Sequence, residues 1–317
     1  MESLTVCVCT CNRAGFLSRL LSELERTPVP DTLLFDVLVV DNASIDNTPE
    51  IVQKFVDRCP NLFRYILEEK AGLSHARNRG LRESNADVVA FLDDDAIPRT
   101  GWLQAIIEGY KNGDDVGAVG GQVLLAFPSE AKLPGWFKKS LYPYFSQREF
   151  DGKGAIDSRD AVDDPYGANI SFLRSLALSL GGFNVSLGRQ GTKLLGGEET
   201  QLCEDIRKAG FRVLLHPGSI VDHHVSLSRI SLKSLFRQAW CDGQVASIWT
   251  IGEYSGLSLK QAFGAYLRLM RRQGHQFSQS WREKDQLVIF FYQLIADMSA
   301  IYHRWSKHRD LESTKPE

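Results

Sequence analysis

The sequence predicts an α/β fold with a mostly parallel, doubly wound sheet, helices on both faces and a helical C-terminal extension. Apolar runs of strand length alternate with helical periodicities through the first hundred residues, which is typical of parallel sheets. Polar side chains follow several of these runs, at the sheet edge where open α/β sheets bind ligands. From Ser228 onward the pattern is helical only.

The first half of the chain alternates regularly. Four apolar runs predict strands, at 4–10, 35–40, 63–67 and 88–92. Helical spacing of apolar residues between them predicts helices at 16–24, 51–56 and 76–80.

Beyond residue 97 the pattern is less regular. We expect helices around 102–107, before 180 and over 198–209, and strands at 116–123, 167–172 and 211–215. Residues 128–164 are rich in Pro, Gly and aromatic side chains and predict a long loop, which in a compact domain is often a binding element. Its aromatic rings either pack over the sheet or form a platform for a sugar ring.

The last ninety residues predict amphipathic helices. Leu232, Leu235, Phe236, Ala239 and Trp240 follow helical spacing, and a second apolar stripe runs over 288–305. From Arg229 onward there are 13 Lys and Arg against 8 Asp and Glu. The stripes either pack on the body or a second copy of the chain, as in a homodimer, or lie on an anionic membrane surface.

Composition limits the function classes. With 43% hydrophobic and 24% charged residues, the 317-residue chain has the composition of a soluble globular protein. Its net charge of −2 gives no basic signature for nucleic acid. Six cysteines without paired metal-binding spacing indicate a reducing compartment, and Met1-Glu2-Ser3 begins no signal peptide. No apolar stretch is long enough to cross a membrane, so we expect a cytoplasmic location, with peripheral membrane contact as an option.

Three consecutive acids, Asp93, Asp94 and Asp95, follow the buried run 88–92. Burying three carboxylates without compensation would cost several kcal/mol per ion, so they must face water, a cation or a ligand. Hard oxygen ligands suit Mg²⁺ or Mn²⁺ together with substrate phosphates. An isolated triplet would fit a solvated turn equally well, and the other strand-end residues decide between the two.

Those residues are Thr10, Asn12 and Arg13 after the first strand and Asp41 after the second. The first turn has neither the dinucleotide-binding glycine pattern nor a P-loop. Two further polar clusters come late in the chain. Glu198 and Glu199 begin a helix, where they either complement the helix dipole or supply a general base. His223 and His224 follow an acid, which is a possible metal-ligand arrangement.

Taken together, these segments resemble the family 2 glycosyltransferases of the GT-A fold over about residues 4–226. Thr10-Cys11-Asn12-Arg13 is similar to the family's nucleotide turn, and Asp41-Asn42-Ala43-Ser44 to its second strand end. The segment 72–80 resembles the G-x-x-x-A-R-N-x-G motif, and 91–95 the F-L-D-x-D metal motif. Gly197-Glu198-Glu199 resembles the family's G-E-D, with Glu where Asp is commoner. The order of the motifs makes the resemblance specific.

The resemblance implies an inverting transfer of sugar from a nucleotide-diphosphate sugar, usually a UDP-sugar, to an acceptor hydroxyl of a saccharide or lipid-linked glycan. It implies a catalytic domain over 1–226, with a nucleotide-binding half at 1–97 and an acceptor-binding half at 98–226, and a helical extension at 227–317. The cofactor is Mg²⁺ or Mn²⁺. The site residues that follow are Thr10, Asn12, Arg13, Asp41, Gly72, Arg77, Asp93 and Asp94 around the donor, Asp95, Asp93, His223 and His224 at the metal, and Trp136, Tyr142, Tyr144 and Asn169 at the acceptor.

Two assignments within this set stay open. Glu199 is the expected base by its motif position, but Glu198 competes with it, because the longer side chain at the Asp position shifts the reach of the carboxylate. Asp94 falls at the variable position of the acidic motif, so its substitution should be the mildest of the three.

Two other classes are alternatives. A nucleotidyltransferase that makes sugar nucleotides shares the sheet and the acidic site, but the glycine-rich first turn it requires is absent. A non-catalytic nucleotide-sugar-binding module could dispense with the acids, whereas both the acidic triplet and the glutamate pair are present here.

Overall fold

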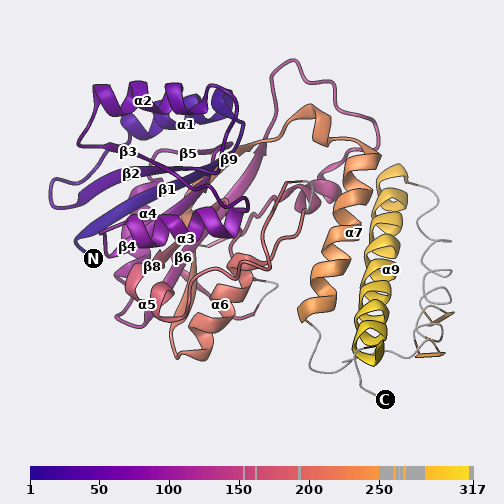
Figure 1. Ribbon diagram of the computed structural model, residues 1–317. Helices are drawn as coiled ribbons and strands as arrows, with labels where there is room; N and C mark the ends of the chain where they lie inside the picture. Colours follow the sequence, from indigo (N-terminus) through magenta and orange to yellow (C-terminus); the bar gives the residue numbers. More distant parts are fainter. Residues whose placement is uncertain are drawn as a thin grey trace. The chain divides into compact units, whose positions relative to one another are not determined.

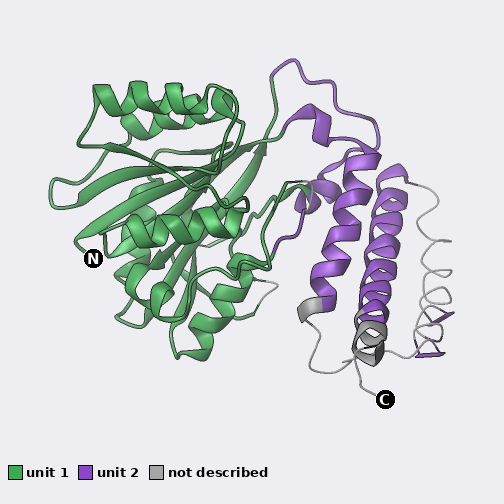
Figure 2. Cartoon of the chain, viewed as in Figure 1, with its two compact units in different colours: residues 1–128, 145–192, 197–225 green, residues 129–144, 193–196, 226–317 purple. Residues whose placement is uncertain are grey.

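The computed structural model describes residues 1–152, 154–160, 163–191, 194–249, 260–261, 264, 267–268 and 283–313. The chain divides into two compact units (Figure 2). The first contains residues 1–128, 145–192 and 197–225. The second contains 129–144, 193–196 and 226–317, so part of the predicted acceptor-binding half belongs to it. The predicted domain boundary after residue 226 stays a proposal.

A nine-stranded sheet forms the centre of the first unit in the described residues (Figure 1). Its order is β3-β2-β1-β4-β8-β6-β9-β5, and β7 pairs with β9. Strands β1 to β4 are mutually parallel neighbours, β6 runs parallel to β9, and β8 lies antiparallel between β4 and β6. The strands are β1 (Ser3–Thr10), β2 (Leu34–Asp41), β3 (Phe63–Leu67), β4 (Val88–Asp93), β5 (Ala96–Pro98), β6 (Val116–Ala126), β7 (Ile156–Ser158), β8 (Asn169–Leu173) and β9 (Arg212–His224).

Helices cover both faces of the sheet, as the sequence predicts (Figure 1). Alternate strand residues enter different cores because successive side chains of a strand point to opposite faces. Val88 and Ala90 join the core beneath α1, α2 and α4, whereas Val89 and Phe91 join the core beneath α3, α5 and α6. The helices are α1 (Ala14–Glu25), α2 (Thr48–Arg58), α3 (Leu73–Glu83), α4 (Trp102–Tyr110), α5 (Arg174–Ser179) and α6 (Glu198–Lys208).

The regular first half matches its expected elements to within a few residues, but the second half differs. The sequence pattern missed β5, whose three residues are too short for a periodicity to show, and β7 inside the long loop. It also ended the last predicted strand at residue 215, because His216-Pro217-Gly218 interrupts the apolar run. In the structure β9 continues through this interruption, with an irregularity in its pairing to β6.

The second unit contains α7 (Leu232–Trp249) and α9 (Lys284–Ser313), after the 3₁₀ turn η2 (Leu227–Arg229). The two helices approach closely at Gly243, where a Cβ atom would lie 2.0 Å from the carbonyl oxygen of Ala296. Most of the 3₁₀ helix η1 (Lys139–Phe145) belongs to this unit, and its Ser140 donates a hydrogen bond to Asp285 of α9. Among the described residues, no helix has both the length and the apolar character needed to span a membrane.

Candidate functional site

The acidic triplet lies in the turn between β4 and β5 and divides between the two faces of the sheet. Asp93 continues the alternation of Val89 and Phe91, so its side chain points to the α3 face. There it accepts a hydrogen bond from Arg77 at 3.2 Å. Asp94 and Asp95 instead contact Arg13, which precedes α1. Three adjacent acids therefore serve two separate clusters.

The α1-side cluster holds two nearly inaccessible carboxylates, those of Asp94 and Asp95, which are 3% and 2% exposed. Arg13 bridges them, with Nη1 2.7 Å from Asp94 Oδ1 and Nη2 2.5 Å from Asp95 Oδ2. The Thr10 hydroxyl donates to the other oxygen of Asp94 at 2.8 Å. Burial raises the pKa of Asp94 to about 7 against the opposing charge of Arg13. This arrangement needs a cation, and Arg13 supplies one.

Asp95 also faces β9. Because β5 pairs antiparallel with β9, Ala96 lies opposite His223, and His223 Nε2 comes to 3.4 Å from Asp95 Oδ1. That oxygen and His223 Nδ1 are buried without a hydrogen-bond partner. Burial alone would raise the pKa of Asp95, but His223 and Arg13 outweigh it and hold the pKa well below the usual range.

The four predicted metal ligands do not converge on one point. Asp93 is paired with Arg77 on the other face, and strand alternation turns His224 away from His223. The described residues contain no group of three or more His, Cys, Asp or Glu side chains that could hold one ion. Of the four, Asp95 and His223 face each other, with Oδ1 and Nε2 3.4 Å apart.

The α3-side cluster is built around Arg77, whose side chain is 4% exposed. Its guanidinium donates to Glu198 Oε1 at 2.7 Å and lies 3.9 Å from Glu199 Oε2, in addition to its bond to Asp93. Glu199 Oε1 accepts a hydrogen bond from the backbone N–H of Gly167 at 3.1 Å. A Cβ atom on Gly167 would lie 2.4 Å from Arg77 Nη2, so a side chain there would displace the guanidinium.

The two glutamates differ in environment. Glu198 is 3% exposed, and burial and the neighbouring Glu199 raise its pKa to about 8 against the opposing charge of Arg77. Glu199 is the more accessible of the two, with a side chain 15% exposed. Each keeps one buried oxygen, Oε2, without a hydrogen-bond partner.

The turn after β2 differs from the sequence-based expectation for Asp41. Its carboxylate is fully buried and accepts hydrogen bonds from the Ser44 backbone N–H and the Tyr65 hydroxyl, each at 2.9 Å. Asp41 thus shapes the turn. Its neighbour Asn42 accepts a hydrogen bond from the Gly72 N–H at 2.7 Å and fixes the start of α3.

A pocket of about 540 Å³ lies between these turns. It brings together most of the predicted donor residues: Thr10, Asn12, Arg13, Gly72, Asp93 and Asp94. Asp41 and Arg77 are not in its lining. The sequence reasoning missed Cys9, Cys11, Asn42 and Arg189, which also line it. Arg189 lies between Gly188 and Gly191, and a charged residue in a glycine-rich stretch is the sequence pattern that could have indicated it.

The predicted acceptor residues divide between the two units. Asn169 is 1% exposed, and its amide oxygen and nitrogen bond Trp102 and the backbone of Gln122 and Ser219. That prediction is wrong, because every polar atom of the Asn169 side chain already holds the sheet and α4 together. The aromatic candidates Trp136, Tyr142 and Tyr144 belong to the second unit, where Tyr144 stacks on Tyr292 of α9 with ring centroids 4.3 Å apart.

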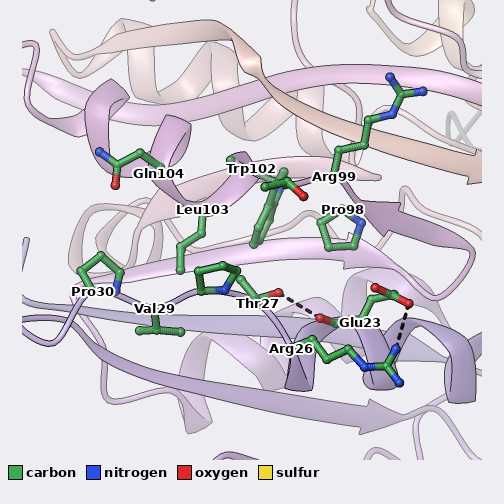
Figure 3. Close-up of a pocket in the computed structure, with 13 residues that line it drawn as sticks. Glu23, Arg26, Thr27, Val29, Pro30, Pro98, Arg99, Trp102, Leu103 and Gln104 are labelled. Atoms are coloured by element: carbon green, nitrogen blue, oxygen red, sulfur yellow. Dashed lines mark hydrogen bonds and ion pairs between the residues drawn. The ribbon is translucent and has the colours of Figure 1, made fainter.

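A second pocket, of about 500 Å³, lies beside the end of α1 (Figure 3). Its lining comes from residues 23–30 and 98–104, including three prolines and the ion pair of Glu23 and Arg26 at 3.3 Å. None of the predicted site residues lines it. The chemistry of the unit is therefore concentrated in the first pocket and its two charged clusters.

The chain is similar in sequence to known glycosyltransferases. Residues 5–155 match the model of Glycosyl transferase family 2. The chain is 28% identical over 247 residues to a glucosyl-dolichyl phosphate glucuronosyltransferase of Haloferax volcanii, covering 75% of this chain and 74% of that one. The matched domain is that of a family 2 glycosyltransferase. This match and the relatives named glycosyltransferases place the chain among enzymes of the transferase class.

Other relatives are similar over comparable lengths. This chain is 27% identical over 258 residues to Glycosyltransferase AglE of the same organism, covering 80% of this chain and 77% of the relative. It is 27% identical over 238 residues to Succinoglycan biosynthesis protein ExoM of Rhizobium meliloti, covering 75% of this chain and 72% of the relative.

Solved structures share the GT-A-like fold. The mannosyltransferase PcManGT of Pyrobaculum calidifontis, solved with GDP-Man and Mn²⁺, has a TM-score of 0.51 at 17% identity and covers 99% of this chain and 76% of its own. GalNAc-T7, solved with UDP, GalNAc and Mn²⁺, has a TM-score of 0.59 at 15% identity. The match covers 100% of this chain and 58% of GalNAc-T7.

Proposed function

We propose that this glycosyltransferase moves a sugar from a nucleotide-diphosphate sugar to an acceptor hydroxyl, with inversion at the anomeric carbon. The observation that carries the proposal is the position of Arg77, which joins Asp93 on the pocket wall to the buried pair Glu198 and Glu199. One guanidinium thereby connects a pocket suited to a nucleoside diphosphate with a pair of candidate bases.

The α1-side cluster fits a divalent cation. Two adjacent ligands of an octahedral ion at about 2.1 Å lie about 3 Å apart. The separation of 3.4 Å between Asp95 Oδ1 and His223 Nε2 is close to that value, and Asp95 Oδ1 has no hydrogen-bond partner. With two protein ligands, the diphosphate and water would complete the shell, as is usual for Mg²⁺. A bound Mg²⁺ or Mn²⁺ would neutralise charge that develops on the leaving diphosphate.

We assign the base to Glu199. Its Oε1 is oriented by the Gly167 N–H, its Oε2 has no hydrogen-bond partner, and it is more accessible than Glu198. A base must reach the proton of the attacking hydroxyl, and the more accessible of the two carboxylates is the better placed to do so. Glu198, at 2.7 Å from Arg77, holds the guanidinium instead.

For the donor we favour a UDP-sugar, and for the acceptor a lipid-linked glycan. The solved neighbours carry GDP-Man or UDP, so the base of the nucleotide is the first property to measure. The glucuronosyltransferase relative is named for glucosyl-dolichyl phosphate, a sugar attached to a lipid phosphate. The aromatic residues Trp136, Tyr142 and Tyr144 stay proposed acceptor contacts.

A lipid-linked acceptor would favour peripheral contact with a membrane. In the second unit Trp240, Phe291 and Tyr302 are exposed on α7 and α9, and Lys233 and Lys284 are exposed on the same helices. Trp, Tyr and Lys are the side chains that settle at membrane interfaces. Flotation with anionic vesicles at low salt tests the contact, and a dimer in light scattering without flotation would assign the same helices to self-association.

A donor panel tests the function. The protein is incubated with UDP-, GDP- and dTDP-sugars, Mn²⁺ and a lipid-linked glycan pool, and released nucleoside diphosphate and glycosylated lipid are measured. Donor-dependent release with product of increased mass supports the proposal, and NMR of the new linkage reports inversion. Pyrophosphate formed from a nucleoside triphosphate and a sugar phosphate would identify a nucleotidyltransferase. Donor binding without turnover would indicate a binding module.

A further inference from the structure

We infer that Arg13 is a resident counter-ion of the acidic cluster that gives way when Asp95 takes up a divalent cation. The inference rests on the proposed metal site and concerns what the chain does before the metal arrives. It starts from the bridge that the Arg13 guanidinium makes between Asp94 Oδ1 at 2.7 Å and Asp95 Oδ2 at 2.5 Å.

The bridge is required by burial. The side chains of Asp94 and Asp95 are 4% and 2% exposed, and two adjacent carboxylates in such a site need a positive charge nearby. The Arg13 guanidinium is the only Lys or Arg group that the described residues place within 4 Å of either carboxylate. Without it, the cluster would be left to the Thr10 hydroxyl and His223.

The Arg13 side chain is more accessible to solvent than that of Arg77, the arginine of the other cluster. The side chain of Arg13 is 32% exposed and lines the pocket, whereas Arg77 on the opposite face is 4% exposed and fixed by three carboxylates. The Arg13 guanidinium lies over the Phe16 ring, 5.0 Å from its centroid, in a partly exposed contact that is worth only about 0.5–2 kcal/mol. The side chain can therefore turn toward the pocket without opening the core.

The exchange follows from charge. A divalent ion bound at Asp95 Oδ1 would stand close to a guanidinium already held by Asp95 Oδ2, and like charges at that separation repel. The cluster then needs one of the two cations and not both. A released guanidinium would face the pocket, where it matches the planar geometry of a phosphate group. Metal uptake would thus convert Arg13 from a carboxylate partner into a diphosphate partner.

Mn²⁺ binding without nucleotide tests the exchange. Titration calorimetry and thermal unfolding are compared for the natural chain, Arg13→Ala and Arg13→Lys. Without the Arg13 guanidinium, a larger fraction of the chains has Asp95 free to bind Mn²⁺. We therefore expect Arg13→Ala to bind Mn²⁺ about ten-fold more tightly. Arg13→Ala should also unfold at a lower temperature without Mn²⁺ and recover more of its stability with Mn²⁺ than the natural chain does.

Arg13→Lys separates exchange from long-range charge. Lysine keeps the charge but cannot bridge two carboxylates as a planar fork does. The inference expects tighter Mn²⁺ binding in this variant too, by about three-fold. Tightening in Arg13→Ala with none in Arg13→Lys would show a field effect only and overturn the exchange.

Arg207→Ala is the matched control. Arg207 pairs with Asp164, itself 1% exposed, at 2.6 Å, and it lies outside the pocket lining. Its loss should destabilise the chain with no extra recovery in Mn²⁺. Equal Mn²⁺ affinity in the natural chain and both Arg13 variants would overturn the exchange while leaving the metal site standing. Absence of Mn²⁺ binding in all of them, with UDP present or not, would overturn the metal proposal and the exchange together.

Discussion

Arg77 Nη1 donates a buried hydrogen bond to Glu198 Oε1 at 2.7 Å although 121 positions separate the two residues in the sequence. The same guanidinium contacts Asp93 at 3.2 Å, so the acidic turn and the glutamate pair share one cation. Each of the five predictions below tests one part of this arrangement or of the neighbouring α1-side cluster.

Arg77→Lys should reduce transfer strongly. A lysine ammonium can reach one carboxylate but not span Asp93 and Glu198, and a lost charge-assisted bond in a buried site is worth about 1.5–3 kcal/mol. We expect kcat to fall by one to two orders of magnitude, in line with that energy, with a smaller rise in KM for the donor. Arg64→Lys is the control, because Arg64 pairs with Asp36 at 2.7 Å outside the pocket lining. Normal turnover in Arg77→Lys would remove Arg77 from the site.

Glu199→Gln should keep donor binding and lose transfer. An amide cannot accept the acceptor proton, and a positioned base typically contributes about 10²–10⁴-fold. Binding of UDP with Mn²⁺ is measured by calorimetry, and turnover by released nucleoside diphosphate. Near-normal turnover in Glu199→Gln, with a large loss in Glu198→Gln, would transfer the base role to Glu198.

Glu198→Gln should change how stability depends on pH. The pKa of Glu198 is raised in the folded chain, to about 8, so its contribution is full below its unfolded pKa of about 4.3 and is lost as the pH rises through 8. Gln does not titrate. The melting temperature of Glu198→Gln relative to the natural chain should therefore rise between about pH 4.5 and 8. A constant difference across this range would contradict the raised pKa.

His223→Ala should weaken the dependence on metal selectively. His223 Nε2 lies 3.4 Å from Asp95 Oδ1, whereas His224 turns to the other side of β9 and serves as the control. Removing one protein ligand should raise the Mn²⁺ concentration for half-maximal activity by about ten-fold or more, and His224→Ala should leave it within two-fold. Activity of the natural chain should disappear with EDTA and return with Mn²⁺. Equal effects of the two substitutions would exclude His223 as a specific ligand.

Asp94→Ala should be more harmful than its motif position indicates. The variable position predicts a mild substitution, but the structure places Asp94 in the interior with bonds to Arg13 and Thr10. Loss of these bonds should reduce the free energy of unfolding by about 1–3 kcal/mol. Chemical denaturation of Asp94→Ala, with the solvent-facing Asp57→Ala as control, measures this cost. A variant as stable as the control would restore the expectation from the sequence alone.

The sequence by itself determined the alternating half of the fold. Strands β1 to β4 and helices α1 to α3 are where apolar periodicity places them, because each element buries a face whose spacing is local. Thr10 and Asp41 end two adjacent parallel strands, so they lie at the same edge of the sheet, where strand-end polar residues are expected. The sequence likewise identified the acidic triplet, which ends an apolar run, and the glutamate pair, which begins a helix.

Only the tertiary structure decided which of these groups meet. The short strand β5 pairs with β9 and sets His223 against Asp95, a contact that no local pattern encodes. Strand alternation sends Asp93 to one face, and the turn that follows sends Asp94 and Asp95 toward Arg13. Asn169 and Asp41 are residue types that are common in binding sites, yet their polar atoms form hydrogen bonds inside the protein. The chemistry of each side chain can be read from the sequence. Its burial and its contact partners depend on residues that the fold brings together from distant parts of the chain.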